Sequence, residues 1–397
     1  MAPSGRSNAF AVTAPGLEAL ALAELQGLGI ADARAEPGGV AFAATTRSLY
    51  QVNLQSRTAS RVVVRAGEFL AKAFHELERR SRRVAWSELI PSHGAVRLRV
   101  TCRKSRLYHS SAVAERVAAA ISAAVPGASF AGTEGPADDD AATVAGESGA
   151  AAAQLVLVRI LHDRCTISVD SSGDHLHRRG YRQALARAPL RETLGAACIM
   201  ASGWPGDRPL IDPMCGSGTL VIEAALMARR MAPGRSRAFA FERWPSFDAP
   251  CWSSVRDEAR SRELPAAGVP LIGADRDAGA IAAAVSNAER AGVVDDTSFV
   301  QRALSATPFD GPPGWLVSNP PYGVRVGDRA PLRDLYARLG TILRARAAGW
   351  RVTLLSADRT LDAQTGLQWT ELFRTTNGGI PVQGLTTTIA ESPTDFS

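Results

Sequence analysis

Cysteine-based metal and disulfide signals are missing from this sequence. The five cysteines, at positions 102, 165, 198, 215 and 251, form no CxxC pair. We therefore expect neither a zinc site nor a disulfide framework, and a reducing, cytoplasmic environment is the default for such a chain. We also expect the chemistry of the protein to need no metal.

Long apolar runs are missing as well. No segment approaches the roughly 20 apolar residues of a membrane-spanning helix. A strand-like segment over residues 9–12 begins almost at once, so we expect no signal peptide. We expect no membrane association. With 397 residues, 46% of them hydrophobic, the chain can form two or three domains with buried cores.

The GxGxxG fingerprint of nicotinamide-binding folds is also absent. In those folds the acid that binds the ribose follows the glycine turn by about 20 residues. Here an insertion over residues 231–269 separates the glycine turn at 214–218 from the next strand end, at Asp275. A nicotinamide cofactor is therefore not expected. The Asp275 side chain could cap the helix expected over 277–291, bind a ligand, or do both.

The whole chain has a net charge of +6. Its positive charge is concentrated in the N-terminal half. Residues 61–108 contain twelve Lys or Arg against four Glu, an excess of eight positive charges. Arg97 and Arg99 alternate with apolar residues, as on a half-exposed strand, and Arg103 and Lys104 follow. Such a segment favours a polyanionic partner, although a solvated basic face explains the charge equally well.

A second basic segment covers residues 171–191, with five arginines against one aspartate. Arg178, Arg179 and Arg182 lie at its centre. The segment could be an ordinary linker with solubilising charge. We favour contacts with phosphates, because an arginine cluster that leads into a catalytic domain is well placed for them.

Helix and strand patterns divide the chain into regions. Residues 1–60 predict a small α+β segment, and 61–170 a second one with a low-complexity, disordered insertion at 133–153. A basic linker at 171–190 precedes the domain over 191–397. There strands and helices alternate, which indicates an α/β fold with a doubly wound, mostly parallel sheet. Ligands of such sheets bind outside the carboxyl ends of the strands.

The stretch over residues 209–223 reads as a strand, a tight glycine turn and a helix. Asp212 ends the strand, Gly216 and Gly218 form the turn, and Thr219 begins the helix. This order places backbone N–H groups and a helix N-terminus against a ligand. We expect a side chain at Gly218 to block the close approach of that ligand.

Asn319-Pro320-Pro321-Tyr322 follows an apolar strand at 315–318. The prolines predict a rigid turn at the strand end. The Asn319 oxygen and a nearby main-chain carbonyl can accept both hydrogens of an sp² amino group, so that the nitrogen lone pair faces an electrophile. Tyr322 offers a ring face, and not its hydroxyl, to a base lifted from its stack. A purely structural turn is the weaker alternative, given the glycine turn upstream.

These two motifs resemble those of class I S-adenosylmethionine-dependent methyltransferases that act on amino groups. More narrowly, nearly the whole chain resembles the THUMP-domain RNA guanine-N2 methyltransferases, and especially the N-terminal half of bacterial enzymes that modify large-subunit ribosomal RNA. The supporting stretches are residues 53–61, 170–182, 188–192 and 213–223.

The resemblance implies a ferredoxin-like segment (1–60) and a THUMP RNA-binding domain (61–170) before a Rossmann-like catalytic domain. It implies S-adenosylmethionine as cofactor and RNA as substrate, ribosomal RNA before transfer RNA. In-line methyl transfer then depends mostly on positioning. The implied cofactor-binding residues are Asp212, Pro213, Cys215, Gly216, Gly218, Thr219, Asp275 and Arg276. Asn319, Pro320 and Tyr322 are implied to hold the target base.

Two positions depart from the family pattern. Ala303 stands where the family usually has an Asp that contacts the cofactor's adenine, and the segment from Asn377 keeps only part of a closing asparagine–glycine turn. Three other functions remain open. The basic N-terminal half argues against a protein-glutamine methyltransferase. The lack of a target-recognition region after Gly323 argues against a DNA adenine-N6 methyltransferase. The intact Asn319–Tyr322 motif argues against an RNA chaperone with a decayed catalytic domain.

Overall fold

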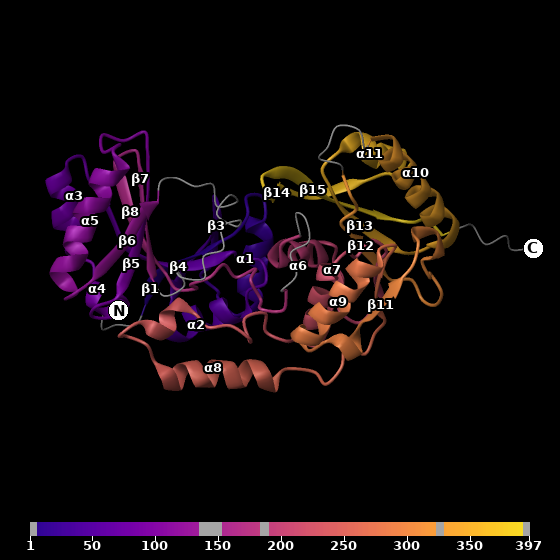
Figure 1. Ribbon diagram of the computed structural model, residues 1–397, viewed down its shortest axis with the longest axis horizontal. Helices are drawn as coiled ribbons and strands as arrows, with labels where there is room; N and C mark the ends of the chain where they lie inside the picture. The colour runs from indigo at the N-terminus through magenta and orange to yellow at the C-terminus, as the bar shows by residue number, and fades with distance from the viewer. Residues whose placement is uncertain (1–5, 135–152, 183–189, 323–328, 392–397) are drawn as a thin grey trace, which may run out of the picture. The chain divides into compact units, whose positions relative to one another are not determined.

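The computed structural model describes residues 6–134, 153–182, 190–322 and 329–391. The chain forms two compact units (Figure 1). The first contains Met1–Thr13, Ala21–Leu176 and Gly234–Glu258, and the second contains Ala14–Leu20, His177–Pro233 and Ala259–Ser397. The regions expected from the sequence, which end at 170 and begin again at 191, are therefore not the units of the structure. Ala14–Leu20 belongs to the second unit, and Gly234–Glu258 belongs to the first.

An eight-stranded sheet in the order β2-β3-β1-β4-β8-β7-β5-β6 forms the centre of the first unit. Its strands are β1 (Ser7–Val12), β2 (Arg34–Glu36), β3 (Gly39–Ala44), β4 (Arg61–Leu70), β5 (Ala95–Arg103), β6 (Ser129–Glu134), β7 (Gln154–Leu161) and β8 (Arg164–Asp170). The long strand β4 pairs with β1 through Arg61–Val64 and with β8 through Val63–Leu70. The regions expected at 1–60 and 61–170 thus share one continuous sheet.

The insertion expected at 133–153 begins later than the sequence suggests. Strand β6 continues to Glu134 and pairs with β5 in parallel. The rest of the expected insertion, residues 135–152, lies outside the described residues.

Helices cover one face of the strand β5. The helices of the N-terminal part are α1 (Glu18–Gly27), α2 (Thr46–Gln55), α3 (Phe74–Ser81), α4 (Trp86–Leu89) and α5 (Ser110–Ala124). Val96, Leu98 and Val100 are buried on the side where α5 packs, with α3 beside α5 (Figure 1). Because side chains alternate along a strand, Arg97 and Arg99 lie on the opposite face.

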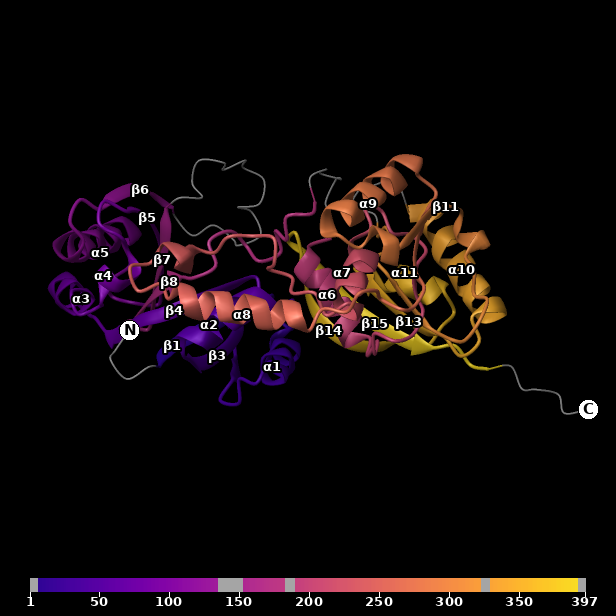
Figure 2. The same cartoon turned by 90° about the horizontal axis from the view of Figure 1, so that it is seen from below.

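Gly234–Glu258, most of the insertion between the glycine turn and Asp275, belongs to the first unit. The insertion carries a 3-10 helix, η3 (Ala240–Arg243), and the helix α8 (Ala249–Ser261), which runs beside α2 in both views (Figures 1 and 2). Tyr50 of α2 stacks on Phe241 with ring centroids 4.3 Å apart. Arg47 donates to Ser254 at 3.2 Å. A fragment that ends before Gly234 would therefore lack part of this unit.

The second unit contains a seven-stranded sheet in the order β11-β10-β9-β12-β13-β15-β14. Its strands are β9 (Leu210–Asp212), β10 (Leu271–Asp275), β11 (Ser298–Gln301), β12 (Trp315–Ser318), β13 (Arg351–Ser356), β14 (Thr370–Asn377) and β15 (Ile380–Thr388). The first five are parallel, and β15 is antiparallel to both β13 and β14. The predicted doubly wound, mostly parallel sheet is confirmed.

Helices lie on both faces of this sheet (Figure 1). They are α6 (Glu192–Ala201), α7 (Thr219–Ala228), α9 (Ala278–Ala291), α10 (Arg329–Arg346) and α11 (Arg359–Gln364), with short 3-10 helices η4 (Val294–Asp296) and η5 (Leu304–Ala306). Leu210 and Val317 pack in one apolar cluster with α6 and α7. Ile211 and Leu316 pack in another with α10. Strands buried on both faces need such continuous apolar runs.

The strand order reverses at β9. This strand lies between β10 and β12. The chain runs from β9 through β10 to β11 on one side and then crosses back to β12 and β13 on the other side. Loops that leave the two strands in opposite directions create a crevice at their carboxyl ends, where ligands of open α/β sheets bind. Asp212 and Ser318 end the strands on either side of this switch point.

No helix among the described residues is long and apolar enough to cross a membrane.

Gly340 allows α10 to contact the backbone after α11. A Cβ atom at this position would lie 1.8 Å from the carbonyl oxygen of Thr365. Gly340→Ala should therefore lower the free energy of unfolding by about 1–3 kcal/mol, as overpacking does. Gly27→Ala, in α1, is the matched control, because its Cβ would meet nothing within 4 Å and alanine is favoured over glycine in helices. Urea unfolding monitored by circular dichroism measures both variants, and equal effects would contradict the packing argument.

Candidate active site

The two glycines of the turn after β9 have different surroundings. Both have positive φ, 51° at Gly216 and 85° at Gly218, which favours glycine. A Cβ at Gly216 would meet nothing within 4 Å, whereas one at Gly218 would lie 3.0 Å from Ala284 and from the Phe299 ring. Gly216 therefore borders open space. A side chain at Gly218 would therefore already clash with the protein itself, and its expected effect on a ligand stays a prediction.

Asp275 ties the glycine turn to the strand β10. Its Oδ2 accepts a hydrogen bond from the Gly216 N–H at 3.0 Å, and its Oδ1 accepts one from the Asp277 N–H at 3.0 Å. The cap of α9 is Asp277, which accepts from the Gly279 N–H at 2.8 Å. Each oxygen of Asp275 keeps a lone pair for a further donor, so the carboxylate can brace the turn and still bind hydroxyl groups.

Asp212 joins the glycine turn to the Asn-Pro-Pro-Tyr turn. Its Oδ1 accepts hydrogen bonds from the Ser318 hydroxyl at 2.6 Å and from the Met214 N–H at 3.1 Å. The side chain is buried, and this burial raises the pKa of Asp212 to about 7 against the lowering effect of the two hydrogen bonds. An uncharged carboxyl group is therefore favoured in this environment when no positive charge is nearby.

Asn319 carries an acceptor without a partner. Its Oδ1 is shielded from solvent and has no hydrogen-bond partner among the residues that the structure describes. Leaving a buried polar group unpaired costs about 1–3 kcal/mol, and such exceptions in a folded protein need an explanation. Pro320, the next residue, is buried, which holds the Asn319 backbone in place.

Tyr322 is half-buried, and its hydroxyl is not free. The ring packs against a cluster of Leu332, Tyr336 and Leu361 from α10 and α11. The hydroxyl oxygen accepts a hydrogen bond of 3.0 Å from Nδ2 of Asn377, at the end of β14. The sequence predicts a role for the Tyr322 ring face and none for this hydroxyl group. No local pattern could have shown the contact, because the two residues are far apart in the chain.

Arg179 lies in the protein interior. Only 4% of the Arg179 surface is exposed. Its Nε lies 3.6 Å from Oε1 of Glu223, a fully buried residue of α7. The Tyr181 hydroxyl donates to the same oxygen at 3.1 Å. A contact between Arg179 and a phosphate would require this cluster to open, so the structure favours an internal role over the predicted RNA contact.

Arg182 also faces inward. It donates to the Thr219 hydroxyl at 2.5 Å and to the Leu190 carbonyl at 2.7 Å, and its Nε lies 3.3 Å from Glu192. The arginine therefore braces the first turn of α7, next to the glycine turn, instead of facing a phosphate. Acidic residues inside the otherwise apolar helices α6 and α7 are the signal that could have revealed these buried partners. Arg178, by contrast, is exposed.

The remaining sequence-predicted residues are divided between interior and surface. Pro213 and Cys215 are buried, and the Cys215 N–H donates to the Ala274 carbonyl at 2.9 Å. Burial raises the pKa of the Cys215 thiol, which favours the uncharged thiol. Arg276 and Ala303 are exposed.

The basic residues predicted on the N-terminal half follow one strand. Arg97 and Arg99 are half-buried on β5, and Arg103 and Lys104 are exposed at its end. Lys104 has a φ of 48°, so the chain turns sharply there. These side chains belong to the first unit, and the two sequence motifs belong to the second.

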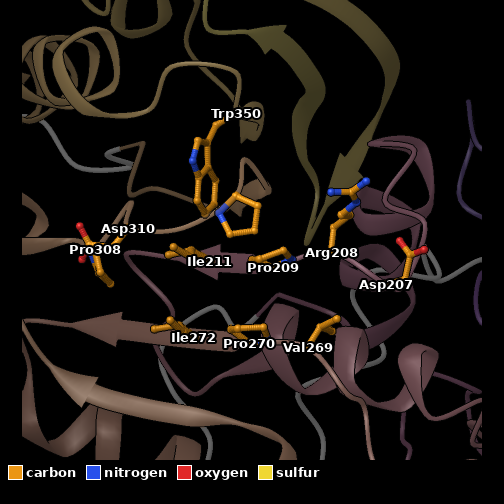
Figure 3. Close-up of a pocket in the computed structure, with 11 residues that line it drawn as sticks. Asp207, Arg208, Pro209, Ile211, Val269, Pro270, Ile272, Pro308, Asp310 and Trp350 are labelled. Carbon is orange, nitrogen blue, oxygen red and sulfur yellow. The ribbon is translucent and has the colours of Figure 1, made fainter. Parts of the chain in front are cut away.

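A separate pocket lies away from both motifs. It has a volume of about 420 Å³ and is lined by residues that include Ile211, Ile272 and Trp350 (Figure 3). Pro209 and Pro270 of its lining precede β9 and β10, so the pocket lies at the end of these strands opposite Asp212 and Asp275. Within the described ranges, no group of three or more His, Cys, Asp or Glu is placed to bind a metal.

Comparison with known proteins decides the family. Residues 179–384 match the RMKL-like methyltransferase domain. The chain belongs to this family. Residues 8–63 match the RlmL ferredoxin-like domain. The methyltransferase family and the Rossmann-like fold expected from the sequence are therefore confirmed, whereas the THUMP assignment of residues 61–170 stays a prediction.

Individual relatives extend over almost the whole chain. A candidate RNA methyltransferase of Synechocystis sp. is 34% identical over 94% of this chain and 94% of its own length. The ribosomal RNA large subunit methyltransferase K/L of Syntrophotalea carbinolica is 37% identical over 96% of this chain and 54% of its own length, so this chain spans about half of that protein. The crystal structure of SMU.472, a candidate methyltransferase complexed with SAH, is 28% identical with a TM-score of 0.83 over 99% of this chain and 100% of that one.

The raised pKa of Asp212 makes stability depend on pH. The pKa of the Asp212 carboxyl group is near its ordinary value of 3.8 in the unfolded chain and about 7 in the folded protein. The stability that protonation provides is therefore complete below about 3.8 and is lost as the pH rises through about 7. Asp212→Asn keeps the acceptor for Ser318 without the charge, so its stability advantage over wild type should be largest at pH 8 and should shrink towards pH 5. Urea unfolding of both proteins without ligand measures the difference in their free energies of unfolding at each pH. A difference that does not change between pH 5 and pH 8 would contradict the raised pKa of Asp212.

Proposed function

We propose that the protein transfers a methyl group from S-adenosylmethionine to the exocyclic N2 of a guanine in large-subunit ribosomal RNA. The unpartnered Oδ1 of Asn319 carries this proposal. A buried acceptor beside a rigid proline turn, at the carboxyl end of a central strand, is suited to hold an amino hydrogen of a flipped base. The K/L relative supports ribosomal RNA over transfer RNA as the substrate class.

The glycine turn and the two acids fit this cofactor. Gly216 borders open space, so a ligand can approach the backbone there. Asp212 has both hydrogen bonds on Oδ1, which leaves Oδ2 for a donor from the cofactor. Asp275 keeps lone pairs for ribose hydroxyls. When bound, the cofactor supplies an electrophilic methyl group on a positively charged sulfur, and a nearby positive charge would favour the ionised form of Asp212.

Positioning dominates the chemistry that these residues can perform. Asn319 Oδ1 accepts a hydrogen bond from the amino group of the base. This bond turns the nitrogen lone pair towards the methyl group. Pro320 keeps the turn rigid, and the Tyr322 ring supports the base by stacking. Holding two reactants in a near-attack geometry can supply a large part of a rate enhancement without an ionisable catalyst.

We further propose that Arg97, Arg99, Arg103, Lys104 and Arg178 supply RNA affinity through phosphates. Phosphate contacts position a nucleic acid without reading its sequence. Arg179 and Arg182 are left out of this set because they brace the protein interior. A cytoplasmic location, where ribosomal RNA is available, follows from this function.

Asn319→Ala should abolish most methyl transfer and leave cofactor binding nearly unchanged. Loss of one well-placed polar contact made in the transition state costs about 3 kcal/mol, or roughly a hundredfold in rate. Transfer of labelled methyl groups to ribosomal RNA measures turnover, and calorimetry measures cofactor affinity.

The matched control is Asn287→Ala. Asn287 is buried, and its Nδ2 donates to the Ser217 carbonyl in the glycine turn at 3.0 Å. This variant should weaken cofactor binding, whereas Asn319→Ala should leave cofactor binding nearly unchanged. Normal turnover in Asn319→Ala would contradict the proposed amino-methyltransferase function. Preferential methylation of DNA adenine in the same assay would instead favour that alternative substrate.

Exchange of Arg103 and Lys104 for glutamine should reduce RNA affinity and its dependence on salt. For single strands the slope of log K against log salt is roughly −0.7 for each phosphate contact, so two lost contacts should reduce its magnitude by about 1.4. Glutamines at Arg333 and Arg338, which are exposed on α10, remove the same charge and form the control. Equal changes in slope for both double variants would show that only net charge matters.

A further inference from the structure

The position of Asn377 is set by a tight hairpin between β14 and β15. Asn377 ends β14 and pairs directly with Ile380. Gly378 and Gly379 between them have φ values of 58° and 81°. A two-residue turn with positive φ at both positions matches the twist of paired strands and strongly favours glycine. The Asn377 side chain is thus presented from a defined backbone, and it is buried with 7% of its surface exposed.

Asn377 meets the candidate catalytic turn through a single polar contact. Its Nδ2 donates a hydrogen bond of 3.0 Å to the hydroxyl oxygen of Tyr322. At the other end of the tyrosine, two prolines restrict the backbone. The apolar cluster that includes Leu332 and Leu361 packs against the ring. The ring is therefore held by its backbone, by its packing and by its hydroxyl tip.

We propose that Asn377 is a positioning residue that sets the orientation of the Tyr322 ring for stacking on the target base. The inference rests on the proposed function, because only a base that needs a fixed ring face gives this contact a role in turnover. It also corrects the expectation that the tyrosine acts through its ring alone. Phenylalanine at position 322 would remove the acceptor and leave a buried amide without its partner, so Tyr322→Phe should not be neutral.

The coupling between the two residues is measured by a double-mutant cycle. Asn377→Ala and Tyr322→Phe should each lower kcat for RNA about fivefold, since a neutral hydrogen bond contributes about 1 kcal/mol and 1.36 kcal/mol corresponds to tenfold in rate. The cofactor KM should not change. Because each substitution removes the same bond, the double variant should be no slower than either single variant, whereas independent effects would multiply.

A reversal of the donor tests the hydrogen bond itself. In Asn377→Asp the carboxylate can accept from the Tyr322 hydroxyl, so this variant should be faster than Asn377→Ala. In a Tyr322→Phe background no donor remains, and the advantage of Asp over Ala should vanish or reverse. A purely structural role of position 377 would give the same order in both backgrounds.

Thr375→Val provides the matched control. Thr375 is buried on the same strand, two residues before Asn377 and on the same face, and its hydroxyl has no partner among the described residues. This substitution changes the polarity of the strand without touching the bond to Tyr322. Its kcat should equal that of wild type, and a comparable loss, about fivefold, would assign the effect to the hairpin as a whole.

A measurement without turnover separates this inference from the proposed function. The chain has only five tyrosines, so selective ¹³Cζ labelling gives few NMR signals, and the signal lost in Tyr322→Phe identifies Tyr322. That signal should shift in Asn377→Ala and stay in place in Thr375→Val. Absence of RNA methylation by the wild-type protein would overturn the proposed function. An active wild type with multiplicative effects in the cycle, or with no shift, would overturn only the role of Asn377.

Discussion

The hydrogen bond from Ser318 to the buried carboxyl group of Asp212 joins the two strand ends on which the candidate active site depends. β9 and β12 are neighbours because the strand order reverses between them. The reversal brings together two turns whose joined residues lie 106 positions apart in the chain. Since the same oxygen of Asp212 also accepts from Met214, one carboxyl group holds the glycine turn and the Asn319–Tyr322 turn at a common edge.

Two buried pairs of an acid and an arginine lie next to the glycine turn. Glu223 in α7 faces Arg179, and Glu192 in α6 faces Arg182. Such pairs are weak evidence for stability, because desolvation offsets much of their attraction, but the loss of one partner leaves the other charge buried and unpaired. Their clear geometric effect is to hold the start of α7, where Thr219 accepts a hydrogen bond from Arg182. The glycine turn therefore leads into a helix whose first turn is firmly braced.

The Asn319–Tyr322 turn combines one unsatisfied group with one satisfied group. Asn319 presents a shielded acceptor that no described residue uses, whereas the Tyr322 hydroxyl is held by Asn377. An unsatisfied acceptor is costly unless a ligand completes it, and an aromatic face supports a base best when the ring is fixed. Under the proposed function, the same four-residue turn binds the edge of a base and supports its face.

The sequence by itself determined the features that depend on a few consecutive residues. The strand–glycine turn–helix unit, the rigid turn from Asn319 and the alternation behind the doubly wound sheet follow from local periodicity and from the restricted backbones of glycine and proline. Only the tertiary structure decided that Arg179 and Arg182 face inward, that residues 234–258 belong to the first unit, and that Asn377 holds Tyr322 from 55 positions away. The physical reason is that charge pairing and packing depend on which distant surfaces meet, and no local period in the chain encodes that choice.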